Sequence, residues 1–158
     1  MLSEHELRGA IAAEASTVAD VRSAVLTARA HDLPLAVYAT GHGTLTPLDG
    51  ALVLKTAPMA EVLVDPGRRV ARVGPGARWR DVIAAAAPFG LAPLSGSSPS
   101  VGVTGYTLGG GVGWLARKHG FVTQPGVAVQ FLPPFRIHFL RHVTQGEHDF
   151  VRHVQPCV

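Results

Sequence analysis

Several residue types are scarce in this sequence, and each shortage excludes a class of protein. The single cysteine, Cys157, stands next to the C-terminus, so an internal disulfide and a cysteine-based metal site are both excluded. Only two lysines are present, and the net charge is +3. Because the arginines are scattered, the pattern favours a solvated surface over a phosphate-binding one, and we expect no nucleic-acid partner.

Long hydrophobic runs are also missing. The longest apolar stretch, residues 82–94, is interrupted by Pro88, Gly90 and Pro93, whereas a membrane-spanning helix needs about 20 apolar residues. Residues 1–9 are polar and of mixed charge, which is unlike a signal peptide. The sequence therefore predicts no membrane association and a cytoplasmic location.

What the chain does contain is enough apolar sequence for one domain with a buried core. It has 158 residues, of which 47% are hydrophobic and 16% charged. Hydrophobic spacing, capping residues and turn signals predict three helices over about 18–31, 79–87 and 114–118. They also predict strands over 35–38, 51–54, 61–65 and 69–74, with the last two joined as a hairpin. This alternation indicates an α+β fold.

Glycine is concentrated in two segments, each of which follows a predicted strand or turn. One is Thr40–Thr44, with His42 between two glycines, and the other runs from Gly96 to Gly113 and holds seven glycines. Glycine leaves backbone N–H groups open to an anion such as a pyrophosphate. The alternative is that glycine serves turns alone. Turns explain the first segment well, whereas the second has more glycine than turns require.

The common nucleotide and hydrolase motifs are not met. The sequence has no GxxxxGK[ST], and Gly109 to Gly113 is not a GxGxxG followed by an acidic residue about twenty positions on. A GxSxG nucleophile elbow is also missing. A P-loop, a Rossmann site and an α/β-hydrolase site are therefore all unsupported.

The glycine-rich stretch carries a resemblance to a known family. Residues 95–120, SGSSPSVGVTGYTLGGGVGWLARKHG, resemble the FAD-binding segment of the vanillyl-alcohol oxidase / p-cresol methylhydroxylase flavoproteins, and within them the berberine-bridge-enzyme-like oxidoreductases. Residues 39–43, ATGHG, are similar to that family's first pyrophosphate loop, R-x-G-G-H-S, although the arginine is missing. The resemblance covers about residues 17–120. It implies an FAD-binding PCMH-type domain with mixed sheets and flanking helices, incomplete at both ends.

The resemblance also implies which residues contact FAD. His42 falls on the histidine that many members bond covalently to the flavin, although a hydrogen bond within its own turn is the alternative. Where bicovalent members have a cysteine in G-x-C-x-x-V-G, this chain has Ser98, so a second covalent bond is excluded. The expected cofactor-binding residues are Thr40, Gly41, His42, Gly43, Thr44, Ser98, Val101, Gly102, Gly105, Tyr106, Gly109, Gly110, Gly111 and Gly113.

The implied activity is that of an FAD-dependent oxidoreductase or oxidase. The flavin would take a hydride from a CH–OH or CH–NH group of a small-molecule substrate. The substrate domain of the family is not recognisable, so no catalytic residue or substrate is assigned. The alternative is a truncated, catalytically inactive fragment that binds FAD weakly or not at all.

Three segments are expected: a lead-in over residues 1–16, a partial FAD-binding domain over 17–120 and a tail over 121–158 that does not match the family. The tail has no lysine and only two acidic residues, but it has four of the eight histidines. We interpret it as a frameshifted or disordered end. A half-domain of this kind would expose unpaired strand edges and tend to self-associate.

The histidines of the tail raise the question of a metal site. His138 and His142 are four residues apart, which would place them on one face of a helix. The sequence between them lacks the glutamate of HExxH, so we predict no metal.

Overall fold

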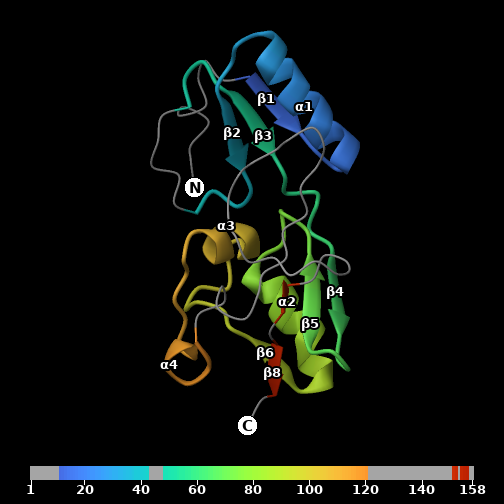
Figure 1. The fold of residues 1–158 in the computed structure, drawn as a ribbon, viewed down its shortest axis with the longest axis vertical. Coiled ribbons are helices and arrows are strands. Elements are labelled where there is room, and N and C mark those ends of the chain that lie inside the picture. The colour runs from blue at the N-terminus through green and yellow to red at the C-terminus, as the bar shows by residue number, and fades with distance from the viewer. Residues whose placement is uncertain (1–10, 43–47, 121–150, 153, 157–158) are drawn as a thin grey trace, which may run out of the picture.

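The computed structural model describes residues 11–42, 48–120, 151–152 and 154–156, and its elements form two groups along the long axis of the molecule (Figure 1). The upper group consists of β1 (Ile11–Glu14), α1 (Val18–Ala30), β2 (Leu35–Tyr38) and β3 (Leu52–Lys55). The rest consists of β4 (Val62–Asp65), β5 (Val70–Val73), α2 (Trp79–Ala86), the 3-10 helix η1 (Ala87–Phe89), β6 (Leu91–Pro93), α3 (Val103–Leu108), α4 (Ala116–His119), β7 (Val151–Arg152) and β8 (Val154–Pro156).

The upper group is a parallel sheet covered by one helix. The strand order is β1-β3-β2, and Leu52 of the central strand pairs with Ile11 on one side and Leu35 on the other. Leu52, Val53 and Leu54 are all buried, which is typical of a central strand in a parallel sheet. Leu52 and Leu54 pack with the small side chains Ala24 and Ala28 of α1. The carboxyl end of β2 leads directly into the first glycine-bearing segment.

A capping box begins α1 at the predicted position. The Thr17 hydroxyl accepts a hydrogen bond from the Asp20 N–H at 3.2 Å, and the Asp20 carboxylate accepts from the Thr17 N–H at 2.8 Å. The Ser16 N–H donates to the same carboxylate. The hydrogen bonds from Ser16 and Thr17 lower the pKa of Asp20. This contribution is therefore present above the unfolded pKa of about 3.9, and it is lost as the pH falls through the lower folded pKa.

We expect Thr17→Ala to lower the free energy of unfolding by about 1 kcal/mol, because it leaves the Asp20 N–H without its cap. The midpoint of urea unfolding followed by far-UV circular dichroism measures the change. Thr27→Ala is the matched control, since Thr27 is exposed inside the same helix. An equal loss in both variants would show that the cap contributes nothing specific.

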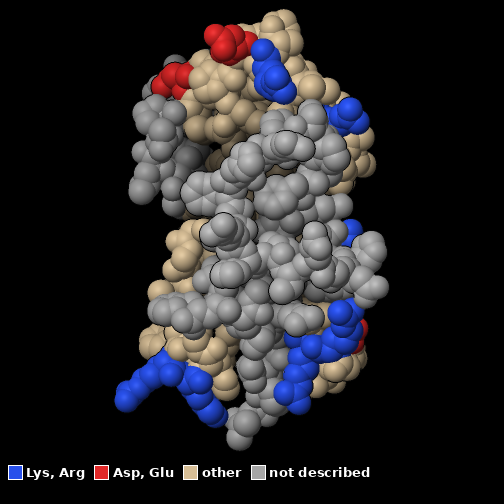
Figure 2. Space-filling view, viewed as in Figure 1, with Lys and Arg blue, Asp and Glu red and all other residues tan. Residues whose placement is uncertain are grey.

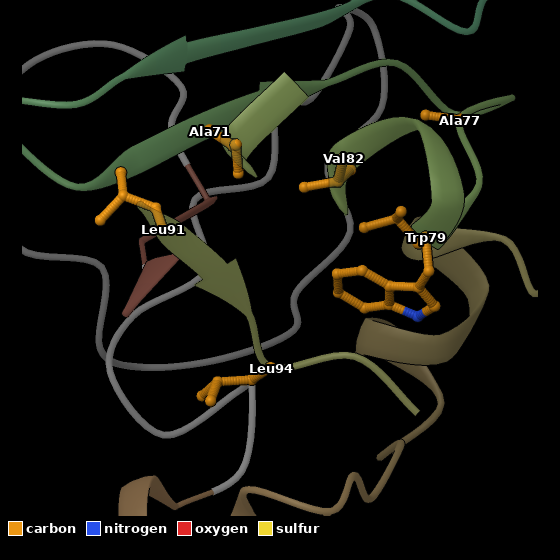
Figure 3. Close-up of a cluster of buried hydrophobic side chains, with 8 residues drawn as sticks. Ala71, Ala77, Trp79, Val82, Leu91 and Leu94 are labelled. Carbon is orange, nitrogen blue, oxygen red and sulfur yellow. The ribbon is translucent and has the colours of Figure 1, made fainter. Parts of the chain in front are cut away.

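The lower group is built around an antiparallel hairpin and α2. Strands β4 and β5 pair with Val62 opposite Val73, and the Arg68 N–H closes the turn by donating to the Asp65 carboxylate at 3.0 Å. Strand β5 also pairs with β7, and β6 pairs with β8. Between these strands and α2 lies the main apolar cluster (Figure 3). Its buried members are Ala71, Ala77, Trp79, Val82, Ala86, Leu91, Leu94 and Val103.

The α+β class and the mixed sheets that the sequence predicts are confirmed, since one sheet is parallel and the other two are antiparallel. Several described elements were not predicted. Strand β1 lies in the expected lead-in, α3 lies inside the glycine-rich segment, and η1, β6, β7 and β8 were not expected. In addition, α4 begins at Ala116 instead of Trp114. Residues 121–150, with His138 and His142, lie outside the described residues.

Three observations bear on the predicted partners and metal: the distribution of charge, the length of the helices and the grouping of possible metal ligands. On the face shown in Figure 2, the described Lys and Arg side chains form separate groups, one of them over α4, whose last turn holds Arg117 and Lys118. Of the helices in the described part of the chain, none combines the length and the hydropathy needed to cross a membrane. Among the same residues, no three His, Cys, Asp or Glu side chains form a metal-binding group.

Candidate cofactor site

Two glycine-bearing loops meet at the junction between the two groups of elements. The first loop, residues 39–42, follows β2, and the second loop, residues 98–102, precedes α3. His42 Nε2 lies 2.9 Å from Ser100 Oγ. A Cβ atom on Gly102 would lie 3.1 Å from the Thr40 methyl carbon, closer than ordinary van der Waals contact, so glycine favours this approach. The structure thus brings Thr40, His42 and Gly102 together, while Gly43 and Thr44 lie outside the described residues.

Backbone hydrogen bonds fix the second loop beside the start of α2. The Trp79 N–H donates to the Val101 carbonyl and the Arg80 N–H donates to the Pro99 carbonyl, each at 3.0 Å. The Val103 N–H donates to the Ala77 carbonyl, also at 3.0 Å, and an antiparallel bridge joins Arg78 to Gly102. The loop is therefore a turn that is held against the start of α2, and the position of its backbone follows from that of α2.

Gly41 is required for two separate reasons. Its φ of +77° lies in the left-handed region, which side chains disfavour. In addition, a Cβ atom at this position would collide with the hydroxyl of Tyr38. The turn interpretation of the first loop therefore holds for Gly41, and the tight turn is also what carries His42 to the second loop.

Hydroxyl groups connect His42 to Ser98, the serine for which the resemblance implies the position of a second covalent attachment. Ser100 Oγ lies 2.9 Å from His42 Nε2 and 3.0 Å from Ser98 Oγ. Among the described residues, the hydrogen-bond partner of the His42 side chain lies 58 residues away in sequence. Sequence reasoning missed Ser100. The available signal was its proximity in sequence to Ser98, which had been singled out; the turn that brings the two hydroxyls together carries no such signal.

Tyr106 of α3 lies in a slot lined by glycines. Its ring meets Trp79 edge to face, with centroids 5.2 Å apart and planes at 89°. A Cβ atom on Gly111 would lie 2.5 Å from three ring carbons, and one on Gly96 would lie 2.9 Å from one of the same three carbons. A Cβ atom on Gly113 would collide with the Ser95 carbonyl. These three glycines therefore make room for packing, whatever else they do.

The Tyr106 hydroxyl is buried, and burial raises its pKa, so the group stays protonated at neutral pH. It has no hydrogen-bond partner among the described residues. A buried hydroxyl without a partner is unusual, and a bound group could supply one.

We expect Gly111→Ala to lower the free energy of unfolding by about 1–3 kcal/mol, because the added methyl group overpacks the slot against the Tyr106 ring. In a Tyr106→Ala background the same substitution should cost much less, and urea unfolding of the four proteins gives the coupling energy. Gly105→Ala is the control, since nothing lies within 4 Å of its Cβ position. Additive effects of Gly111→Ala and Tyr106→Ala would contradict the packing role.

Gly105 differs from the slot glycines, because neither packing nor backbone conformation requires it. It lies within α3, where glycine costs about 0.5–1 kcal/mol relative to alanine. Its Cβ position is open, and so is that of the neighbouring Gly110, which has a φ of +77°. A glycine that lowers helix stability and leaves its Cβ position open is consistent with the close approach of a ligand. The site therefore fits a large cofactor: a bare helix face, a loop–loop junction and a buried hydroxyl without a partner.

The comparisons place this chain among the FAD-binding flavoproteins. Residues 10–132 match the family model described as FAD binding domain. The chain belongs to that family and its cofactor is FAD, which confirms the resemblance noted in the glycine-rich segment.

Curated relatives support this assignment. The (R)-6-hydroxynicotine oxidase of Paenarthrobacter nicotinovorans is 34% identical over 122 residues, which cover 76% of this chain and 27% of that protein. The FAD-linked oxidoreductase azaL of Aspergillus niger is 29% identical over 122 residues, covering 75% of this chain and 26% of its own length. The chain thus spans about a quarter of the length of these relatives.

Solved structures show the same fold. The 6-hydroxy-D-nicotine oxidase of Arthrobacter nicotinovorans aligns with a TM-score of 0.66 and 35% identity, covering 70% of this chain and 25% of that one. A variant of the BBE-like 1 protein of Physcomitrella patens aligns with a TM-score of 0.65 and 30% identity, with the same coverages. The partial FAD-binding fold that the resemblance implies is therefore confirmed.

Proposed function

We propose that this chain forms the flavin-binding part of a berberine-bridge-like FAD-dependent oxidoreductase that takes a hydride from a CH–OH or CH–NH group of a small molecule. The observation that carries the proposal is the junction of the two loops, which places His42 2.9 Å from Ser100. Two segments about sixty residues apart thereby form one continuous surface. The relatives named as oxidases and FAD-linked oxidoreductases support the reaction class.

In this proposal the first loop and the second loop hold FAD together with the bare face of α3. The chain's own groups orient the cofactor: backbone N–H groups of the glycine segments face its phosphates, and His42 lies at the end nearest the flavin ring. The bound flavin supplies the redox chemistry by accepting the hydride. The cofactor-binding set remains the one that the sequence predicts, and Ser100 joins it.

Covalent attachment through His42 is part of the proposal. Ser98 occupies the place of the cysteine in bicovalent relatives, and its hydroxyl is hydrogen-bonded to Ser100. A serine hydroxyl is a far weaker nucleophile than a thiolate at neutral pH. We therefore expect one covalent bond and no more.

A second candidate is an inactive fragment that binds FAD weakly. The chain spans about a quarter of the length of the relatives it matches, so the activity of the whole protein is a proposal. Turnover is accordingly proposed only for a protein in which a substrate domain completes this one. The segment bounds at 16/17 and 120/121, the frameshifted tail, self-association and the cytoplasmic location stay predictions.

Adding FAD to the purified chain tests the proposal. After removal of unbound FAD, the protein should keep flavin absorbance, and after acid precipitation the flavin should remain in the protein pellet. Flavin that binds but stays in the acid supernatant would support FAD binding and contradict covalent attachment. A chain of native-like circular dichroism that retains no flavin would contradict the proposal and support the inactive fragment.

A further inference from the structure

We propose that Ser100 is a positioning residue for His42: its hydroxyl holds imidazole Nε2 and leaves Nδ1 as the ring nitrogen directed to the cofactor. The inference rests on the proposed function, because it concerns how the chain presents His42 to FAD. Ser98 acts behind Ser100 as the second hydroxyl of the same hydrogen-bonded chain. Ser100 and Ser98 are not assigned a chemical step of their own.

The geometry favours positioning because one end of the hydrogen-bonded chain is fixed and the other is exposed. His42 lies in an exposed tight turn, so its ring has freedom that a positioning partner must restrict. Ser100 lies between Pro99 and Val101, whose carbonyls accept hydrogen bonds from the start of α2 at 3.0 Å. Because the backbone on both sides of Ser100 is held, its hydroxyl is a fixed point for the imidazole.

The Ser98 hydroxyl gives Ser100 a second hydrogen-bond partner. Ser100 Oγ has contacts at 2.9 Å and 3.0 Å, to an imidazole nitrogen and to a hydroxyl. A hydroxyl donates one hydrogen bond and accepts others. Ser100 either donates a hydrogen bond to Nε2 or accepts one from it. In both cases Nε2 is engaged, so Nδ1 is the nitrogen left for another partner. The residue at the position of the missing cysteine thus supports the histidine instead of forming a bond to the flavin.

The first test uses the FAD-free chain, so that its result does not depend on the proposed function. Long-range ¹H–¹⁵N spectra of the histidine rings, with His42 assigned by His42→Gln, report which nitrogen carries the proton. We expect Ser100→Ala to shift the Nε2 and Nδ1 resonances of His42, whereas Ser100→Thr should keep the wild-type pattern. Ser97→Ala is the matched control, because Ser97 is an exposed serine in the same segment.

Identical His42 resonances in the wild type and Ser100→Ala would overturn the inference, and so would equal shifts in Ser97→Ala. If Ser100→Ala does not fold, Ser98→Ala replaces it. That variant removes the second hydroxyl of the chain and should produce a smaller shift of the same resonances. No shift in Ser98→Ala would then overturn the inference.

The second test measures flavin incorporation. Ser100→Ala should slow the build-up of acid-stable flavin about tenfold, the effect expected from loss of one hydrogen bond of ordinary strength. Ser100→Thr and Ser97→Ala should incorporate flavin at the wild-type rate. A wild-type chain that retains no flavin contradicts the proposed function, and the ring-nitrogen spectra then decide this inference alone. Equal rates in all four proteins contradict the role of Ser100 in attachment.

Discussion

Replacing Trp79 with alanine is expected to lower the free energy of unfolding by about 3–5 kcal/mol, the usual range for truncating a large buried aromatic side chain. Trp79 is 3% exposed and belongs to the main apolar cluster, where its ring lies below Val82 (Figure 3). It also supports the edge of the Tyr106 ring. Truncation therefore leaves a cavity and removes the partner of a second aromatic ring.

Urea unfolding followed by circular dichroism measures this loss, and two controls define its origin. Phe89→Ala should cost less than about 1 kcal/mol, because Phe89 is 52% exposed. Trp79→Phe should cost less than Trp79→Ala, since it keeps an aromatic ring and removes an indole N–H that has no partner among the described residues. A Trp79→Ala cost close to that of Phe89→Ala would contradict this account of the core.

The same substitution should also weaken FAD binding, although Trp79 is not proposed to contact the cofactor. The backbone N–H of Trp79 donates to the Val101 carbonyl of the second loop, and the Trp79 ring packs edge to face with Tyr106 of α3. Trp79→Ala keeps the backbone hydrogen bond, so the expected weakening comes from the loss of the indole that packs against α3 at the start of α2. Stability and cofactor binding are therefore coupled through one residue at the start of α2.

Local sequence signals were sufficient for the elements that carry them. Helix α1 has a capping box and an apolar face, and the β4–β5 hairpin has alternating side chains on both sides of a Pro–Gly turn. Helix α2 was predicted from the spacing of Trp79, Val82 and Ala86, all of which are buried. In each case the sequence preference and the tertiary packing favour the same structure.

Elements that depend on tertiary contacts escaped prediction. Strand β1 is the short stretch IAAE, which lacks the alternation of apolar and polar residues that usually predicts a strand. It is a strand because it pairs with β3. Helix α3 contains Gly105 and follows Gly102, so its local preference is poor. It forms because Val103 is buried in the main cluster and Tyr106 packs on Trp79. Packing overrides propensity at both places.

The two glycine-bearing segments of the candidate site could be predicted from the sequence, but the contacts that bring them together could not. The excess of glycine after Ser95 marks an unusual segment, but the pattern does not show which of its glycines packing requires. The structure separates them: Gly96, Gly111 and Gly113 surround Tyr106, whereas Gly105 leaves open space. Ser100 was missed because its importance lies in a contact with a residue 58 positions away.

His42→Ala is expected to abolish acid-stable flavin completely, because His42 is the one residue proposed to form the covalent bond. The neighbouring hydroxyls of Ser98 and Ser100 are weak nucleophiles, and they hydrogen-bond to one another. Flavin fluorescence of the acid-precipitated protein, compared with a sample that received no FAD, measures the effect. The folded structure should persist, since His42 is exposed and its contact with Ser100 is worth only about 1 kcal/mol at most.

His31→Ala is the matched control, because His31 is an exposed histidine at the end of α1 and far from the loop junction in sequence. It should retain wild-type acid-stable flavin. Loss of flavin in both variants would point to a general effect on folding, and retention in both would show that the bond forms elsewhere. Flavin that His42→Ala binds but releases on acid treatment would separate the two roles of the loop: the glycines hold the cofactor, and the histidine makes its attachment permanent.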